Sequence, residues 1–197
     1  MRDHPITPEI SNLDQIVLDQ WSHLARAASD RHLPWHTPVL ANVGESRARL
    51  RTVVLRSADP STRVLTCHTD SRSPKICQLQ SDPHFSWLFY DSAAKVQLRA
   101  YGHAWIHQDD SLADERWQEG AWRSAQCYRT PYPPGTECQE QDLDISEPID
   151  PQTGREHFVV LACEITELDW LFLRVEGHRR ALFCWENDRW IGKWIAP

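Results

Sequence analysis

The longest regular pattern in the chain is a two-residue alternation that runs from Lys95 to His107. One set of side chains is apolar or small: Val96, Leu98, Ala100, Gly102, Ala104 and Ile106. The other set is polar or aromatic: Gln97, Arg99, Tyr101, His103, Trp105 and His107. Successive side chains of a β-strand point to opposite faces, so the pattern predicts one long strand. We expect the apolar face in the core and the second face at a dimer interface or pocket wall.

Shorter stretches indicate further strands between turn residues. These strands are expected at 37–43, 51–55, 64–67, 84–90, 157–165, 168–175, 179–185 and 189–195. The 84–90 stretch is apolar on both faces, which is typical of a central strand. Three- and four-residue spacing of apolar side chains predicts a helix at 10–28, capped by Ser11 or Asn12. A second helix is expected at 109–127.

Length and composition favour one globular domain. The chain has 197 residues, of which 41% are hydrophobic and 25% charged. It contains no apolar window near 18 residues and no signal-peptide pattern, so we expect a cytoplasmic protein without a membrane partner. Its six cysteines are scattered and form no C-x-x-C pair, which favours reduced thiols and no metal site.

Positive charge is concentrated between Arg47 and Lys75, where seven basic and two acidic residues occur in a chain of net charge -7. A basic patch on an acidic protein favours a small anionic ligand over nucleic acid. At the end of this stretch, Ser73 and Pro74 are typical of the N-cap and first position of a helix. The free amides of that helix start, with Ser73 and Lys75, predict a phosphate-binding site.

Four short motifs follow one another along the chain: Arg51-x-Val53-Val54-Leu55-Arg56, Thr69-x-x-x-Ser73-x-Lys75, Pro83, and Gln97-x-Arg99-x-x-Gly102. Their order and spacing resemble the FMN-binding split-barrel family of pyridoxamine 5'-phosphate oxidase, in particular its shorter, less characterised members. The resemblance implies a mainly β fold with flanking helices (α+β), an antiparallel six-stranded Greek-key split β-barrel. It implies one domain over residues 1–197, with an N-terminal helix at about 10–28, an acidic loop at about 130–156 and a C-terminal hairpin at about 179–197.

The resemblance also implies FMN as cofactor, a homodimer with its site between the subunits, and an FMN-dependent oxidoreductase of a small-molecule substrate. The cofactor-binding residues that it implies are Arg51, Thr52, Val53, Val54, Arg56, His68, Thr69, Ser73, Lys75 and Gln97. Among them, Arg51, Ser73 and Lys75 would hold the phosphate, and Gln97 would reach the partner's flavin. Strand alternation places Arg51 and Arg56 on opposite faces unless a bulge intervenes, so here the pattern and the resemblance disagree.

The sequence departs from the family at two places. Pro74 stands where the better-known oxidases have a basic residue, and Arg72 is the candidate replacement. The region of Trp170 and Arg179–Arg180 corresponds to an aromatic residue and an arginine beside the ring or substrate, with a register uncertain by one or two residues. The family's substrate-binding arginine and histidine are not clearly reproduced, which leaves the substrate and the direction of reaction open.

Three alternatives stay open from the sequence. The barrel could bind a flavin or haem without turnover, with His68 and His103 as candidate haem ligands. It could be a silent structural dimer whose basic strand only prevents sheet-to-sheet aggregation. The acidic run at 137–150 is either a solvent-exposed insertion or a substrate lid.

Overall fold

The computed structural model describes residues 12–120, 126–140 and 152–197. Its strands are β1 (Val39–Gly44), β2 (Arg47–Thr52), β3 (Ser57–Asp59), β4 (Val64–Asp70), β5 (His84–Asp91), β6 (Val96–His107), β7 (Phe158–Phe172), β8 (Arg179–Glu186) and β9 (Arg189–Ile195). Its α-helices are α1 (Leu13–Ser29), α2 (Pro74–Ser81) and α3 (Ser111–Gln118), with 3-10 turns at Pro34–His36 and Arg155–His157.

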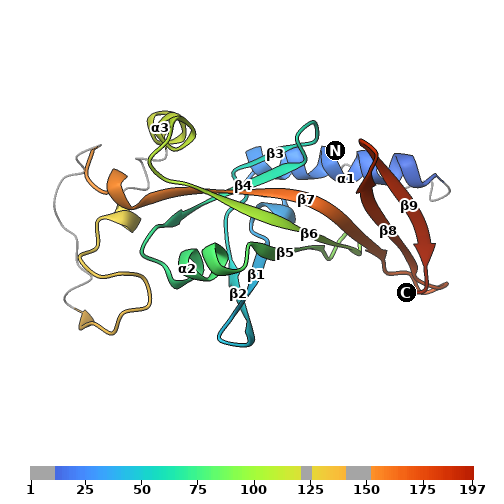
Figure 1. Cartoon of the computed structure of the whole chain (residues 1–197). Coiled ribbons are helices and arrows are strands. Elements are labelled where there is room, and N and C mark those ends of the chain that lie inside the picture. The colour runs from blue at the N-terminus through green and yellow to red at the C-terminus, as the bar shows by residue number, and fades with distance from the viewer. Residues whose placement is uncertain (1–11, 121–125, 141–151) are drawn as a thin grey trace.

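The strands form one antiparallel sheet in the order β2-β1-β5-β6-β7-β4-β3, with β8 paired to β7 and β9 to β8. β6 and β7 run along the length of the molecule, with α2 and α3 toward one end and the β8–β9 hairpin at the other (Figure 1). This architecture confirms the predicted split barrel. The described residues hold nine strands, because short β3 and the β8–β9 hairpin extend the sheet beyond the six barrel strands that the resemblance implied.

The two edges of the sheet approach each other where the chain passes from β2 to β3. We call this passage, residues 53–56, the seam. The amides of Val53 and Leu55 donate to the carbonyls of Pro38 and His36, at 3.0 and 2.9 Å. The amide of Arg56 then donates 2.8 Å to the carbonyl of Thr66 in β4. The seam therefore changes partner within three residues and connects the two sides of the open barrel.

The alternation in β6 is confirmed, since its side chains from Val96 to Ala104 are buried at every second position. Its partner β7 is a single strand of 15 residues, so the prediction of two strands at 157–165 and 168–175 was wrong. Thr166, which lies between the two predicted strands, forms a bulge where the pairing shifts between Tyr101 and Gly102. Gly102 is required there, because a Cβ atom would lie 1.8 Å from the carbonyl oxygen of Glu164.

The core is built from large aromatic side chains between the sheet and α1. Trp35, Trp87 and Trp170 are fully buried, which accounts for part of the high tryptophan content. α1 contributes a buried stripe of Ile16, Val17, Trp21, Leu24 and Ala27. In β5, only Phe85, Trp87 and Phe89 face this core, while Tyr90 on the other face is exposed. β5 lies between β1 and β6, so the prediction of a central strand is confirmed, although only one of its faces lies in the core.

Helix boundaries follow local capping signals. Asn12 caps α1 by accepting from the amides of Asp14 and Gln15. The helix expected at 109–127 ends as α3 at Gln118, and Gly120 follows with φ of 132°, a backbone conformation that ends a helix. The C-terminal hairpin is observed as β8 and β9, joined by Asn187 and Asp188.

Three predicted segments lie partly outside the described residues, and the first is the helix expected at 10–28, of which residues 10 and 11 are not described. Residues 121–125 of the expected second helix, and 141–151 of the expected acidic loop, lie outside the described residues. The described parts of that loop, 130–140 and 152–156, contain no strand. No described helix is both long and apolar enough to cross a bilayer.

Candidate anion-binding site

The candidate site begins where β4 leads into α2. Lys75 lies in the first turn of α2, and its ammonium donates to the hydroxyls of Thr69 and Ser73 at 2.6 and 2.7 Å. Thr69 and Ser73 are buried. The predicted helix start is confirmed, with Ser73 at the N-cap and Pro74 at the first position. The Ser73 side chain makes no capping bond to the helix amides and binds Lys75 instead.

Arg51 reaches this region from β2 across β1. Its guanidinium donates to the side-chain oxygen of Asn42, whose amide nitrogen donates 2.9 Å to Gln78 of α2. Burial is the main cause that lowers the pKa of Lys75, and the charge of Arg51 lowers it further. Arg51, Thr69, Ser73 and Lys75 are thus brought together, as the phosphate prediction requires.

A buried thiol marks the centre of the positive region. Burial raises the pKa of Cys67 to about 12, against the opposing charges of Lys75, Arg56 and Arg51. β2 ends at Thr52, and the seam interrupts strand alternation before Arg56. Alternation from Arg51 therefore does not extend to Arg56 and does not place the two side chains on opposite faces.

This site differs from the other arginine clusters in the described residues because its basic side chains have no carboxylate partner. Within the described residues, Arg51, Arg56 and Lys75 form no ion pair, and the hydrogen-bond partners of Arg51 and Lys75 are neutral. Elsewhere carboxylates neutralise the guanidinium groups at 2.5 to 2.7 Å: Arg63 with Glu164, Arg72 with Asp70, Arg99 and Arg180 with Asp169, and Arg155 with Asp114. Because unpaired charge is costly away from water, the arrangement is suited to an anion.

Arg72, the candidate replacement for the basic residue missing at Pro74, is bound to other parts of the protein. Its guanidinium binds Asp70 through Nε and Nη2, at 3.1 and 2.7 Å. It also donates to the carbonyls of Thr130 and Tyr128, at 2.8 and 3.3 Å. Arg72 therefore ties the 128–130 segment to the end of β4.

His68 lies on the opposite face of β4 from Thr69, as strand alternation requires. Its ring meets Phe158 edge-on at 4.8 Å, in a cluster with Trp117 and Tyr128. Burial lowers the pKa of His68 to about 4, with further contributions from Arg56 and Arg116. Its Nε2 atom is buried without a hydrogen-bond partner in the described part of the chain. His68 is therefore neutral near pH 7 and separate from the Lys75 cluster.

The remaining predicted residues occupy two regions. Thr52, Val53 and Val54 lie at the start of the seam, next to Arg51. Gln97 pairs with Leu171, whereas Thr69 pairs with Val159, twelve residues away along β7. Gln97 therefore lies toward the opposite end of β7 from the residues that pair with Thr69, and in the described part of the chain no hydrogen bond or ion pair joins Gln97 to Lys75.

The arginine and aromatic residue expected near the ring make their described contacts away from Lys75. Trp170 is fully buried in the core beneath β6. Arg180 binds buried Asp169 through Nε and Nη2, at 3.0 and 2.7 Å, and Arg99 binds the same carboxylate. Arg179 is exposed.

Part of the chain matches a known protein family. Residues 18–108 match the family described as pyridoxamine 5'-phosphate oxidase, FMN-binding domain, and this range contains all ten predicted site residues. Over these residues the chain is similar to pyridoxamine 5'-phosphate oxidase-related, FMN-binding proteins. No curated protein matches it.

Solved structures of this family share the fold over nearly the whole chain. A pyridoxamine 5'-phosphate oxidase-related, FMN-binding protein from Nostoc punctiforme is 26% identical, with a TM-score of 0.74 over 95% of this chain and 99% of the other. PhzG from Burkholderia lata, solved with tetrahydrophenazine-1-carboxylic acid, is 20% identical, with a TM-score of 0.69 over 98% and 97% of the two chains. The second likeness supports the fold alone.

Sequence reasoning missed three residues of the site. Cys67, Asn42 and Gln78 were not predicted, although Asn42 gave a signal: it is a polar residue on the face of β1 that buries Leu40. The partners of Asn42 lie on β2 and α2, so its role depends on strand pairing that a local pattern does not reveal.

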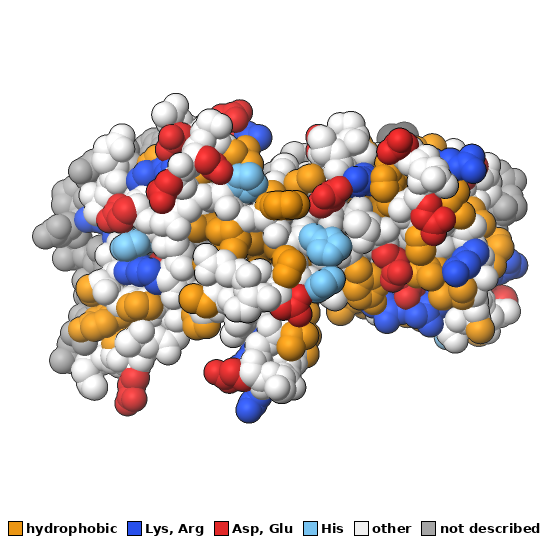
Figure 2. Space-filling model, in the orientation of Figure 1, with side chains coloured by type: hydrophobic (Ala, Val, Ile, Leu, Met, Phe, Trp, Pro, Cys, Tyr) orange, Lys and Arg blue, Asp and Glu red, His pale blue; other side chains and the backbone are white. Residues whose placement is uncertain are grey.

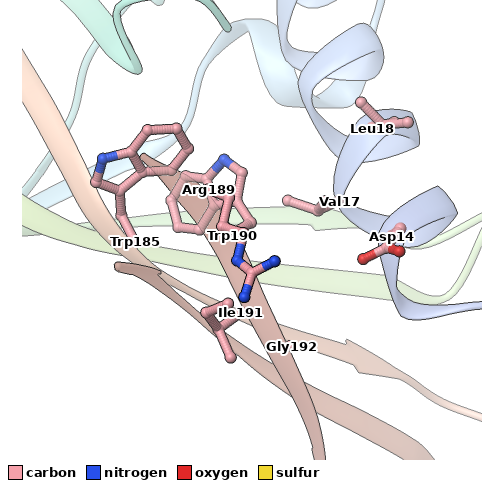
Figure 3. Close-up of a pocket in the computed structure, with 8 residues that line it drawn as sticks. All are labelled: Asp14, Val17, Leu18, Trp185, Arg189, Trp190, Ile191 and Gly192. Carbon is pink, nitrogen blue, oxygen red and sulfur yellow. The ribbon is translucent and has the colours of Figure 1, made fainter. Parts of the chain in front are cut away.

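An open groove of about 630 Å³ lies elsewhere, between α1 and the β8–β9 hairpin (Figure 3). It is lined by Asp14, Val17, Leu18, Trp185, Arg189, Trp190, Ile191 and Gly192, none of which is a predicted site residue. In the described ranges no three His, Cys, Asp or Glu side chains are grouped to hold a metal ion.

Proposed function

We propose that the chain is an FMN-binding flavoprotein that acts as an oxidoreductase on a small-molecule substrate. The observation that carries the proposal is the half-buried pair Arg51 and Lys75, with Arg56 nearby, held only by neutral partners. A phosphate monoester carries close to two negative charges at neutral pH and matches this unpaired positive charge. A guanidinium binds phosphate bidentately, while an ammonium acts as a point charge.

The residues present fit the parts of FMN. Arg51, Lys75, Ser73 and Thr69 would hold the phosphate, and the seam with Thr52 would offer backbone groups to the ring. Bound flavin would supply the electron transfer, while the protein binds it, orients it and excludes water. His68, neutral near pH 7, would border the site on the α3 side.

We further infer that the working unit is a homodimer. Gln97 and the Arg99–Asp169–Arg180 cluster lie toward the end of β7 opposite to the residues that pair with Thr69, and we propose that a second copy supplies them to the flavin held at Lys75. The sheet face that carries Gln97 is not covered by the described chain. It exposes Val43 (56%), Leu50 (63%), Tyr90 (47%) and Trp105 (59%). Figure 2 shows hydrophobic and histidine side chains at the surface near the middle of the view.

The first test is the visible absorption spectrum of the purified protein, followed by identification of the chromophore released on denaturation. About one FMN per chain would support the proposal. A colourless protein that also fails to bind added FMN would contradict it. A haem spectrum would instead favour the non-catalytic alternative, for which the unpartnered Nε2 of His68 is the specific observation.

The second test removes the phosphate contacts. In the double variant Arg51→Ala with Lys75→Ala, two charge-assisted contacts of about 1.5–3 kcal/mol each are lost. We expect FMN affinity, measured by titration calorimetry, to fall by several kcal/mol. Arg47→Ala, which removes an exposed arginine of the same strand, is the matched control and should leave the affinity unchanged. Equal affinity in the double variant and the wild type would disprove the phosphate site.

A further inference from the structure

We propose that Asn42 is a positioning residue that fixes the Arg51 guanidinium without neutralising it, and so makes the site selective for a dianionic terminal phosphate. The proposal rests on the proposed function, since it assigns a specificity determinant to the same site. Its basis is a hydrogen-bonded chain that crosses three elements, from Gln78 in α2 through Asn42 in β1 to Arg51 in β2.

The hydrogen bonds of Asn42 determine the orientation of its side-chain amide. The Nδ2 atom donates to the Val43 carbonyl at 3.0 Å and to Gln78 Oε1 at 2.9 Å. A carbonyl can only accept, so the nitrogen must lie on that side. The Oδ1 atom is therefore directed to Arg51, which can only donate. Asn42 is 5% exposed, so water does not compete strongly for these groups.

Gly44 makes room for this chain of amides. A Cβ atom at Gly44 would lie 2.5 to 2.9 Å from the side-chain amide atoms of Gln78. Gln78 can therefore lie across the backbone of β1 and hold Asn42 from the α2 side. The position of Arg51 is thus linked to the helix that carries Lys75.

The neutral character of Asn42 has an electrostatic consequence. An aspartate would fill nearly the same volume and would still accept from Arg51, as Asp70 accepts from Arg72 and Asp169 from Arg180. It would also cancel the Arg51 charge at the site. With Asn42, the charges of Arg51 and Lys75 both remain available to the ligand, which favours a dianion over a monoanion or a neutral molecule.

The experiment compares FMN with riboflavin, which shares the ring and lacks the phosphate, in wild type and Asn42→Asp between pH 8 and pH 5. At pH 8 we expect N42D to weaken FMN binding by about 10- to 100-fold, the effect of one charge-assisted contact. Riboflavin binding should be unchanged. The ratio of variant to wild-type FMN dissociation constants should shrink as the pH falls, because the FMN phosphate, with a second pKa of about 6, becomes a monoanion and is repelled less by the introduced carboxylate. A purely structural role of Asn42 would give no such pH profile and would affect both ligands.

Two further variants make the test decisive. Asn12→Asp makes the same chemical change at the α1 cap and should leave both affinities unchanged. If N42D does not fold, Gln78→Glu places the carboxylate one step farther along the same chain, and we expect a smaller loss of FMN affinity in the same direction. If neither ligand binds the wild type, the proposed function fails together with the inference. If FMN binds the wild type but loses no affinity to either acidic variant, the inference alone is overturned.

Discussion

At the scale of single residues, burial at the end of β4 keeps two neighbouring ionisable groups uncharged. It raises the pKa of the Cys67 thiol to about 12 and lowers that of His68 to about 4, so both are neutral near pH 7. The positive charge of the region therefore comes from Arg51, Arg56 and Lys75 alone. A site built in this way changes its net charge little between pH 6 and pH 8, and the ligand's own ionisation dominates any pH effect on binding there.

His68 should make the stability of the protein depend on pH. Its pKa is 6.5 in a model peptide and about 4 in the folded chain. Between pH 6.5 and pH 4, His68 binds a proton in the unfolded chain and not in the folded chain. The stabilisation that neutral His68 provides is therefore present above pH 6.5 and is lost as the pH falls. At pH 5 the expected loss is about 2 kcal/mol. In His68→Gln, urea unfolding at pH 7 and pH 5 should show that this loss is absent.

His84→Gln is the control for that measurement, because His84 is exposed at the surface of β5. Other acid-sensitive groups act equally in all three proteins, so the difference between wild type and His68→Gln is the quantity of interest. The same pH-dependent loss in all three would show that His68 accepts a proton as easily in the folded as in the unfolded chain.

At the scale of elements, the bulge between β6 and β7 depends on one glycine. In Gly102→Ala, the new methyl group would lie 1.8 Å from the Glu164 carbonyl oxygen, which belongs to the backbone and cannot rotate away. The two central strands would have to separate locally. We expect the free energy of unfolding to fall by at least about 3 kcal/mol, measured by urea denaturation.

Gly177→Ala provides a comparison for Gly102→Ala. Gly177 lies in the loop before β8 with φ of 115°, and a Cβ atom there would meet nothing within 4 Å. The cost should be limited to backbone strain of about 1–2 kcal/mol. Similar losses in the two variants would mean that β6 and β7 relax around the methyl group.

Elements with local signals were predictable, and contacts across the sheet were not. The alternation of β6 and the Ser73–Pro74 helix start follow from neighbouring residues, and both are confirmed. The uninterrupted β7 was missed, because whether Thr166 ends a strand or forms a bulge depends on Gly102 in another strand. For the same reason Arg72 was taken as a possible phosphate ligand: its carbonyl partners Tyr128 and Thr130 are distant in sequence.

At the scale of the whole molecule, the proposed homodimer predicts a loss of both assembly and FMN binding when the open sheet face is charged. Trp105→Asp places a carboxylate where an exposed indole would be buried, which removes about 1.5–3 kcal/mol of apolar burial per copy and adds a desolvation cost. By analytical ultracentrifugation we expect twice the 22.9 kDa chain mass for the wild type, and the chain mass for Trp105→Asp at the same concentration.

Val175→Asp serves as the reference variant, because Val175 is 92% exposed in the loop before β8. It should sediment like the wild type and keep its FMN affinity. A wild-type protein that sediments as a single chain while binding FMN would show that Gln97 is not supplied by a second copy.

We expect the native fold to open first at the seam. The segment donates hydrogen bonds to the two sides of the barrel through the amides of Val53, Leu55 and Arg56. These bonds are isolated and do not form the continuous ladder of a paired strand. Amide hydrogen exchange there should report local opening at a lower free energy than exchange in β6. A ligand held by Arg51 on one side and by Thr69 and Lys75 on the other would bridge this weak point. Its binding should then slow exchange at the seam more than anywhere else in the sheet.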